Sequence, residues 1–328
     1  MSTEGGTKAV IAAMIANGGI AVTKFLAFLA TGSSSMLSEA IHSVADTCNQ
    51  GLLLIGGKRS LRAPDEAHQF GYGRTRYVYA FIVAIVIFLL GGLFSLYEGW
   101  HKFHFPEPLE KVWIAYTVLI ISILLESWSF RTALREVNRS RGSKSLFRYV
   151  REARQPELPT VLLEDSGALI GLCFALFGVF MADTTGDYRW DGVGAFSIGV
   201  LLVIIAIFLA IEMSSLLVGE SALPEEEARI RAAVLAQAGI GSVIHMRTLH
   251  TGPDELLVGV KVGIDPGYPA ADLALLIDGA EERIRAELPT AHWIYIEPDV
   301  VRVEASADEV SAGPQPPAAP EAAAPAEA

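Results

Sequence analysis

The sequence predicts an α-helical membrane protein with a small α+β domain near its C-terminal end. Six apolar segments of about 20 residues are each long enough to cross the hydrocarbon core of a bilayer. The chain of 328 residues is 52% hydrophobic and only 19% charged. The whole net charge of −12 lies in residues 220–328, because residues 1–219 hold equal numbers of acidic and basic side chains. An acidic C-terminal part argues against nucleic-acid binding.

The predicted membrane spans divide residues 1–220 into six helices. Their expected limits are 9–30, 36–56, 78–100, 113–133, 159–182 and 193–218. The first span has no short apolar region followed by a cleavage site, so we expect a retained helix and not a signal peptide. The alternative, a soluble core of six long and nearly uncharged helices, is disfavoured. Cys48 and Cys173 are too few and too far apart for a disulfide framework or a cysteine-rich metal module.

The loops between the spans predict the orientation. Basic side chains concentrate in the loop after the second span and in the loop after the fourth, while the opposite loops carry only Lys102, Lys111 and Arg189. The positive-inside rule therefore places both termini in the cytoplasm, as in a multi-pass protein of a cell inner membrane. The long basic loop 134–158 is either an amphipathic segment on anionic lipid or a solvated linker.

Residues 221–303 predict a cytoplasmic two-layer domain. Pro224 and the three glutamates that follow it form a favourable helix start. Two strand-like runs, 243–250 and 255–264, flank the turn at 252–254, and a helix over 269–288 and a strand over 292–297 follow. The order αββαβ is typical of a small α+β domain. The Ala/Pro/Glu composition of residues 304–328 predicts a disordered tail.

Ionisable side chains inside the spans are the first functional candidates, because they are costly in a membrane. His42 and Asp46 lie four residues apart and share one face of the second span. An imidazole nitrogen and a carboxylate oxygen together suit a cation such as Zn²⁺. The alternative is a His–Asp hydrogen bond that joins two helices.

The fifth span begins with a second pair of ionisable residues, Glu164 and Asp165. Asp165 would lie about 9 Å inside the membrane and Asp46 about 15 Å, so a modest tilt brings them level. These residues can complete a tetrahedral site, although neighbours on a helix point about 100° apart and Glu164 need not face it. A carboxylate pair reaching toward the membrane surface is the alternative.

Other ionisable residues have weaker signals. Glu126 and Glu212 also lie within spans and are either proton relays or partners in interhelical hydrogen bonds. His101 and His104 in an outer loop form a spacing that usually has no function.

Three motifs together resemble the cation diffusion facilitator family of divalent-metal/proton antiporters. They are Gly32-Ser-Ser-Ser-Met-Leu-Ser-Glu-Ala-Ile-His-Ser-Val-Ala-Asp, then Arg62-Ala-Pro-Asp-Glu-Ala-His-Gln-Phe-Gly-Tyr-Gly-Arg, then Glu164-Asp165-Ser166-Gly167. The resemblance covers residues 7–300 and is greatest to the zinc transporter branch with Glu-Asp in the fifth span. It implies that the C-terminal domain is ferredoxin-like and that the protein forms a homodimer.

The resemblance also implies the ligands of the transported ion. His42, Asp46 and Asp165 fall on three of the family's four ligand positions, and Val161 stands where the fourth is usually histidine. That departure leaves three ligands unless Glu164 substitutes. In the loop after the second span, Asp65 and His68 match a further metal position, whose third member is Tyr72 here.

In the C-terminal domain the resemblance implies dimerisation without a full zinc cluster. Tyr295 stands where histidine is common, and His245 remains near the first strand. We expect His250 and His292 to be surface residues.

The sequence therefore predicts a secondary transporter that exports a divalent metal in exchange for protons. Zn²⁺ is the favoured cargo, with Mn²⁺, Fe²⁺, Co²⁺ or Ni²⁺ as alternatives, and no organic cofactor is expected. Metal and proton binding are linked, because the ligands must lose protons to bind metal. The rivals are a membrane metal sensor and a metal-dependent hydrolase that uses Glu164 as its base. Neither an HExxH motif nor a nucleophile elbow supports the hydrolase.

Overall fold

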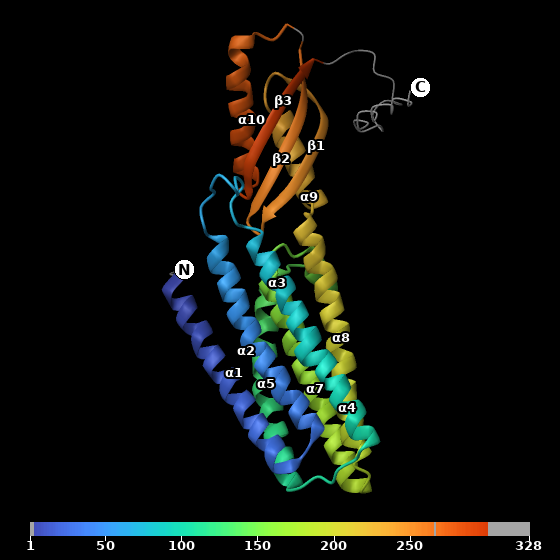
Figure 1. Ribbon diagram of the computed structural model, residues 1–328. Helices are drawn as coiled ribbons and strands as arrows, with labels where there is room; N and C mark the ends of the chain where they lie inside the picture. Colours follow the sequence, from blue (N-terminus) through green and yellow to red (C-terminus); the bar gives the residue numbers. More distant parts are fainter. Residues whose placement is uncertain (1–2, 266, 301–328) are drawn as a thin grey trace, which may run out of the picture.

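A computed structural model describes residues 3–265 and 267–300, in a helical bundle with an α+β domain at one end (Figure 1). We call the end of the bundle next to that domain the domain end, and the opposite end the far end. The disordered tail predicted for residues 304–328 lies outside the described residues.

Long helices form the bundle, and each contains one of the predicted spans. They are α1 (Thr3–Thr31), α2 (Ser34–Ser60), the continuous α3 (Thr75–Val86), η1 (Ile87–Leu93) and α4 (Phe94–His104), then α5 (Val112–Ser140), α7 (Glu157–Thr185) and α8 (Arg189–Val218). Within the described residues, four of these are long and apolar enough to cross a membrane, namely Thr75–His104, α5, α7 and α8. Helix α2 is not among the four, since its polar residues lower its hydropathy.

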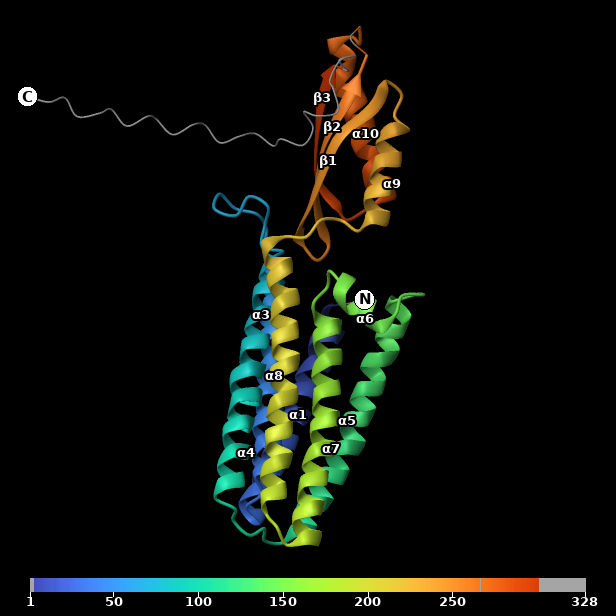
Figure 2. The ribbon, with the colours of Figure 1, turned by 90° about the vertical axis from the view of Figure 1, so that its right-hand side faces the viewer.

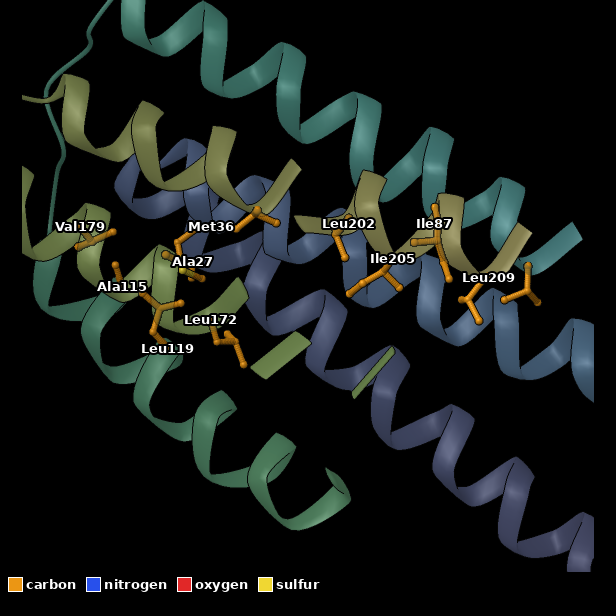
Figure 3. Close-up of a cluster of buried hydrophobic side chains, with 14 of the residues drawn as sticks. Ala27, Met36, Ile87, Ala115, Leu119, Leu172, Val179, Leu202, Ile205 and Leu209 are labelled. Carbon is orange, nitrogen blue, oxygen red and sulfur yellow. The ribbon is translucent and has the colours of Figure 1, made fainter. Parts of the chain in front are cut away.

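Apolar side chains from α1, α2, η1, α5, α7 and α8 meet in one elongated core (Figure 3). Met36, Leu119 and Leu172 are fully buried there, and Leu202 and Leu209 extend the cluster along α8. Close packing of this kind fixes the rotation of each helix about its own axis. The core therefore decides which polar faces of α2 and α7 turn toward each other.

A π-helix of seven residues, η1, interrupts the third long helix where it passes α2. Gly91 and Gly92 lie within it, and a Cβ at Gly92 would come within 2.7 Å of Val203 on α8. The absence of side chains at this point lets α2 and α8 approach the irregular turn closely. π-Helical turns are frequent near functional sites.

The C-terminal part has the predicted order αββαβ. It comprises α9 (Pro224–Leu235), β1 (Ile240–Gly252), β2 (Glu255–Ile264), η2 (Ala270–Asp272), α10 (Leu273–Glu287) and β3 (Ala291–Val300). The sheet has the order β1-β2-β3, with β1 and β2 antiparallel and β2 and β3 parallel. Because parallel strands need a crossover, α10 connects β2 to β3, and both helices cover one face of the sheet (Figure 2).

Candidate metal centre

Helix α2 carries the first pair of predicted ligands. Ser33 caps the helix, because its side chain accepts a hydrogen bond from the backbone N–H of Met36. One helical turn separates His42 and Asp46, and 3.6 Å separates His42 Nδ1 from Asp46 Oδ1. Neither ring nitrogen of His42 has a hydrogen-bond partner among the described residues, although the side chain is 1% exposed. The helix-joining hydrogen bond is therefore not formed.

Helix α7 carries the second pair, and polar side chains of two other helices hold it in place. Glu164 Oε1 accepts a hydrogen bond of 2.8 Å from Asn49 Nδ2 on α2. Asp165 Oδ2 accepts one of 2.9 Å from Ser129 Oγ on α5. Both carboxylates are thus oriented by neighbouring helices, and neither reaches freely toward the membrane surface.

A small cavity of about 20 Å³ brings α1, α2, α5 and α7 together at these residues. This volume holds about one water molecule or one dehydrated ion. Its polar wall contains Asn17, Ser43, Asp46, Gln50, Glu126, Ser129, Glu164 and Asp165, and its apolar wall contains Ile20 and Val161. The polar side chains offer oxygen donors from four helices, so the lining favours a cation.

His42 does not line this cavity. Its Nδ1 would lie 3.7 Å from a Cβ at Gly91, so the ring lies close to the π-helical turn. The structure therefore brings Asp46, Glu164 and Asp165 to one cavity and leaves His42 beside it. Among the described residues no group of three His, Cys, Asp or Glu side chains is close enough to enclose a metal ion.

The loop between α2 and α3 brings Asp65, His68 and Tyr72 together. Asp65 Oδ2 accepts a 2.6 Å hydrogen bond from Tyr72 Oη and a 3.1 Å bond from Arg62, while the backbone N–H groups of Ala67 and His68 donate to Oδ1. The hydrogen bond from Tyr72 is the largest cause that lowers the pKa of Asp65 to about 2. These hydrogen bonds to the Asp65 carboxylate therefore stabilise the shape of the loop.

The remaining candidates occupy varied positions. Glu126 is a cavity residue, whereas Glu212 lies 3.7 Å from Arg151, at the domain end. In α4, His101 stacks on Tyr97, and His104 contacts the ring of Trp100 at a tilt. The basic loop contains the short helix α6 (Leu146–Glu152), which lies across the domain end in Figure 2.

The prediction that His250 is a surface residue of the α+β domain was wrong. His250 is 4% exposed and not a surface residue, because it lies near the end of β1 against the segment that joins α8 to α9. Its backbone N–H donates to the carbonyl of Glu220 at 2.9 Å, and burial lowers the pKa of its ring. His245 and His292 are exposed, and Tyr295 lies on the open face of the sheet.

Charged side chains join the bundle to the α+β domain. Arg76, at the start of α3, donates to Glu157 at the start of α7 and to Asp254 in the β1–β2 turn, at 2.5 and 3.1 Å. Gly73 lies so close to this turn that a Cβ there would come within 2.9 Å of the Gly252 Cα. The domain therefore contacts the loop after α2 directly and is linked through Arg76 to the start of the helix that carries Glu164 and Asp165.

A carboxylate-lined cavity between helices of a membrane bundle is typical of a cation transporter. The family comparison agrees, since residues 10–218 match the model described as "Cation efflux transmembrane domain". The match covers more than half of the chain, and the protein belongs to the cation efflux family. The resemblance inferred from the three sequence motifs is thereby confirmed.

Three relatives illustrate the range of similarity. The mitochondrial proton-coupled zinc antiporter SLC30A9 of Mus musculus is 33% identical over 80% of this chain and 47% of its own length. Metal tolerance protein C4 of Arabidopsis thaliana is 31% identical over 65% of this chain and 47% of its own. The cation-efflux pump FieF of Klebsiella pneumoniae is 26% identical over 86% and 89%. The chain spans about half the length of the first two relatives.

Solved structures of the MamM CTD match the chain more weakly. One form, at 16% identity, covers 25% of this chain and all of its own, with a TM-score of 0.24.

Proposed function

We propose that the protein exports a divalent metal cation across a membrane in exchange for protons, with Zn²⁺ as the favoured cargo. The supporting observation is the oxygen-lined cavity between α1, α2, α5 and α7 in a chain of the cation efflux family. The relative named as a proton-coupled zinc antiporter supports the choice of cargo and of counter-ion. Mn²⁺, Fe²⁺, Co²⁺ and Ni²⁺ remain the alternative cargoes.

In this proposal Asp46 and Asp165 are the principal ligands, and His42 and Glu164 complete the coordination. His42 lies one turn from Asp46 with both ring nitrogens unpaired, so a small change of rotamer or helix position would bring an imidazole nitrogen to the ion. Glu164 faces the same cavity, but part of its hydrogen-bonding capacity is used by Asn49. Protons that return to these groups when the ion leaves would couple the two fluxes.

We do not place a second metal at Asp65 and His68. The four hydrogen-bond donors around the Asp65 carboxylate would have to be displaced first, and Tyr72 is one of them. We propose instead that this loop is shaped by its internal hydrogen bonds. The side chains of Asp65 and His68 are too exposed to enclose an ion without ligands from another chain.

The wider architecture is part of the same proposal. All six long helices would span the bilayer, α2 included, with its polar residues turned inward toward α7. Residues 1–220 would form the membrane domain, with both termini on the cytoplasmic side of an inner membrane. Residues 221–303 would form a ferredoxin-like domain that pairs two copies into a homodimer.

Transport in liposomes tests this function. Purified protein is reconstituted with an imposed pH gradient, and uptake of Zn²⁺ and then of the other four cations is followed. We expect gradient-driven movement of at least one ion, lost in Asp46→Asn and in Asp165→Asn. Asp183→Asn is the matched control, because this α7 aspartate lies outside the cavity lining and accepts a hydrogen bond from Tyr116.

The other outcomes separate the rivals. Binding of metal without net movement would support the sensor, and release of a hydrolysis product without ion movement would support the hydrolase. Transport that is undiminished in both cavity variants would overturn the assigned ligands.

A further inference from the structure

A lysine and a glutamate are fully buried between α1 and α2. Lys24 is 1% exposed and Glu39 is not exposed at all. The Lys24 ammonium donates to Glu39 Oε2 at 2.9 Å and to Ser43 Oγ at 2.8 Å. Ionised groups at this depth of a membrane bundle are expensive, so a role beyond simple packing is expected for them.

The ammonium of Lys24 does not line the proposed transport cavity but is hydrogen-bonded to a residue of its wall. Its acceptor Ser43 lines that cavity together with Asp46. Glu39 precedes His42 by three residues and Asp46 by seven, so all three share one face of α2. The ion pair therefore continues, along the same helix face, the row of groups that would hold the metal.

Glu39 keeps part of its carboxylate free. Its Oε1 atom is buried without a hydrogen-bond partner among the described residues. Gly171 of α7 leaves the space for it, because a Cβ there would lie 2.8 Å from Oε1. The carboxylate is thus bonded to Lys24 through Oε2, while its Oε1 atom lies against Gly171 of α7 without a hydrogen-bond partner among the described residues.

Lys102 is a second buried lysine, and it anchors a turn away from the cavity. It is 3% exposed, and its ammonium donates to the backbone carbonyl of Gly32 at 2.9 Å. It lies at the far end of the bundle, at the end of α4, and does not line the cavity. Burial alone therefore does not distinguish Lys24, whereas its position beside the cavity does.

We propose that Lys24 is a tethered counter-cation of the transport cavity. Its ammonium repels a bound divalent ion and so lowers the affinity of the cavity, which lets the ion leave, while Glu39 holds the ammonium in place. Two positive charges repel strongly where water is scarce. A carrier must bind its ion tightly enough to load it and weakly enough to release it. This inference rests on the proposed function.

Three variants measure the effect of each charge. Lys24→Met removes the ammonium and keeps the length of the side chain, Glu39→Gln removes the carboxylate, and the double variant removes both. We expect Lys24→Met to lower the Kd for Zn²⁺ about tenfold and to slow turnover. Glu39→Gln should raise the Kd by a similar factor, and the double variant should return it close to the wild-type value.

The measurement is Zn²⁺ titration of purified protein by calorimetry at about pH 8, paired with transport in liposomes. Opposite shifts that cancel in the double variant are not produced by a loss of packing. Lys102→Met is the matched control and should leave the Kd unchanged. If Lys24→Met does not fold, the Glu39→Gln and double variants still decide the question by their difference in Kd.

A Kd that is unchanged or raised in folded Lys24→Met would overturn this inference, as would a double variant whose Kd equals that of Glu39→Gln alone. Failure of the proposed function looks different, because wild-type protein would then move no divalent ion. If transport depends on Asp46 and Asp165 while the Lys24 variants do not shift the Kd, only the counter-cation role is lost.

Discussion

The far end of the bundle and the middle of α2 differ in how their buried polar groups are hydrogen-bonded. At the far end, Asp191 of α8 is fully buried and accepts hydrogen bonds from Ser33 Oγ and the backbone N–H groups of Ser34 and Ser35 at 2.7, 2.7 and 3.2 Å. In the middle of α2, both nitrogens of His42 and one oxygen of Asp46 are buried without a hydrogen-bond partner among the described residues.

Under the proposed function, this difference separates polar groups that serve the fold from those that would hold the transported ion. Buried polar groups that serve the fold are normally hydrogen-bonded, since an unpaired one costs about 1–3 kcal/mol. The far end meets that expectation through a carboxylate placed at the N-terminus of α2, where it also interacts favourably with the helix dipole. The unpaired groups near the cavity are those that a bound cation would satisfy.

The largest expected effect is the loss of Asp191. Asp191→Ala leaves the hydroxyl of Ser33 and the N–H groups of Ser34 and Ser35 buried without their acceptor. We expect the free energy of unfolding to fall by about 2–4 kcal/mol. Thermal unfolding in detergent, followed by tryptophan fluorescence, measures this.

Asp46→Asn is the comparison for that measurement, because it changes a carboxylate with a buried oxygen that has no hydrogen-bond partner among the described residues. Its Tm in the absence of metal should stay at or above the wild-type value, as expected where a functional site carries strain. An equal loss of stability in both variants would remove the distinction between the two regions.

A smaller effect is expected where α4 and α8 touch through their backbones. A Cβ at Gly99 would lie 2.7 Å from the carbonyl of Gly192 and would also meet the backbone of Phe196. Because backbone atoms cannot move aside cheaply, Gly99→Ala should destabilise the protein by about 1–3 kcal/mol.

Gly57→Ala is its control, since nothing lies within 4 Å of a Cβ at Gly57 in α2. A helical alanine in open space should be neutral or stabilising by up to about 1 kcal/mol. Measured Tm values that move together in the two variants would contradict this packing of the far end.

The third prediction concerns the composition of the cavity wall. Val161 lines the cavity, so Val161→His would add an imidazole to a set of oxygen donors. Because Zn²⁺ accepts nitrogen ligands more readily than Mn²⁺, we expect the Kd for Zn²⁺ to fall about tenfold and that for Mn²⁺ to change little. Val161→Gln, which adds an amide of similar size, is the control, and equal effects on both ions would contradict the prediction.

The sequence predicted contacts along one helix well and contacts between helices poorly. The i, i+4 spacing of His42 and Asp46 followed from helix geometry, and the αββαβ order followed from turn residues and periodicity. Helix rotation depends on the packed core, which no local pattern encodes. The sequence therefore did not reveal that His42 faces Gly91, that Ser129 holds Asp165, or that Lys24 pairs with Glu39.

One signal was nevertheless present. A lysine in the apolar first span is as costly as the acidic residues that were singled out, and Lys24 could have been paired with Glu39 on that ground. His250 was misjudged because its burial comes from the segment that joins the bundle to the α+β domain. That contact joins parts of the chain that only the tertiary structure brings together.

The smallest effect is expected in the loop around Asp65, whose polar groups are hydrogen-bonded to one another but exposed to solvent. The pKa of Asp65, about 2, lies below the ordinary value near 3.9, so the hydrogen bonds to its carboxylate stabilise the loop above about pH 4. That stabilisation is lost as the pH falls from about 4 toward 2. Tyr72→Phe removes the largest cause of the shift, so the pKa of Asp65 should rise toward its ordinary value.

Carbon-13 NMR of protein with labelled aspartate side chains, in nanodiscs, measures this pKa. Tyr295→Phe is the control, because that exposed tyrosine lies on the sheet and not beside Asp65. Transport should be unaffected in both variants, since the loop is proposed to bind no metal. A Tyr72→Phe variant in which added Zn²⁺ shifts the Asp65 resonance, at a pH where the carboxylate is ionised, would instead show that the tyrosine had been keeping a metal position closed.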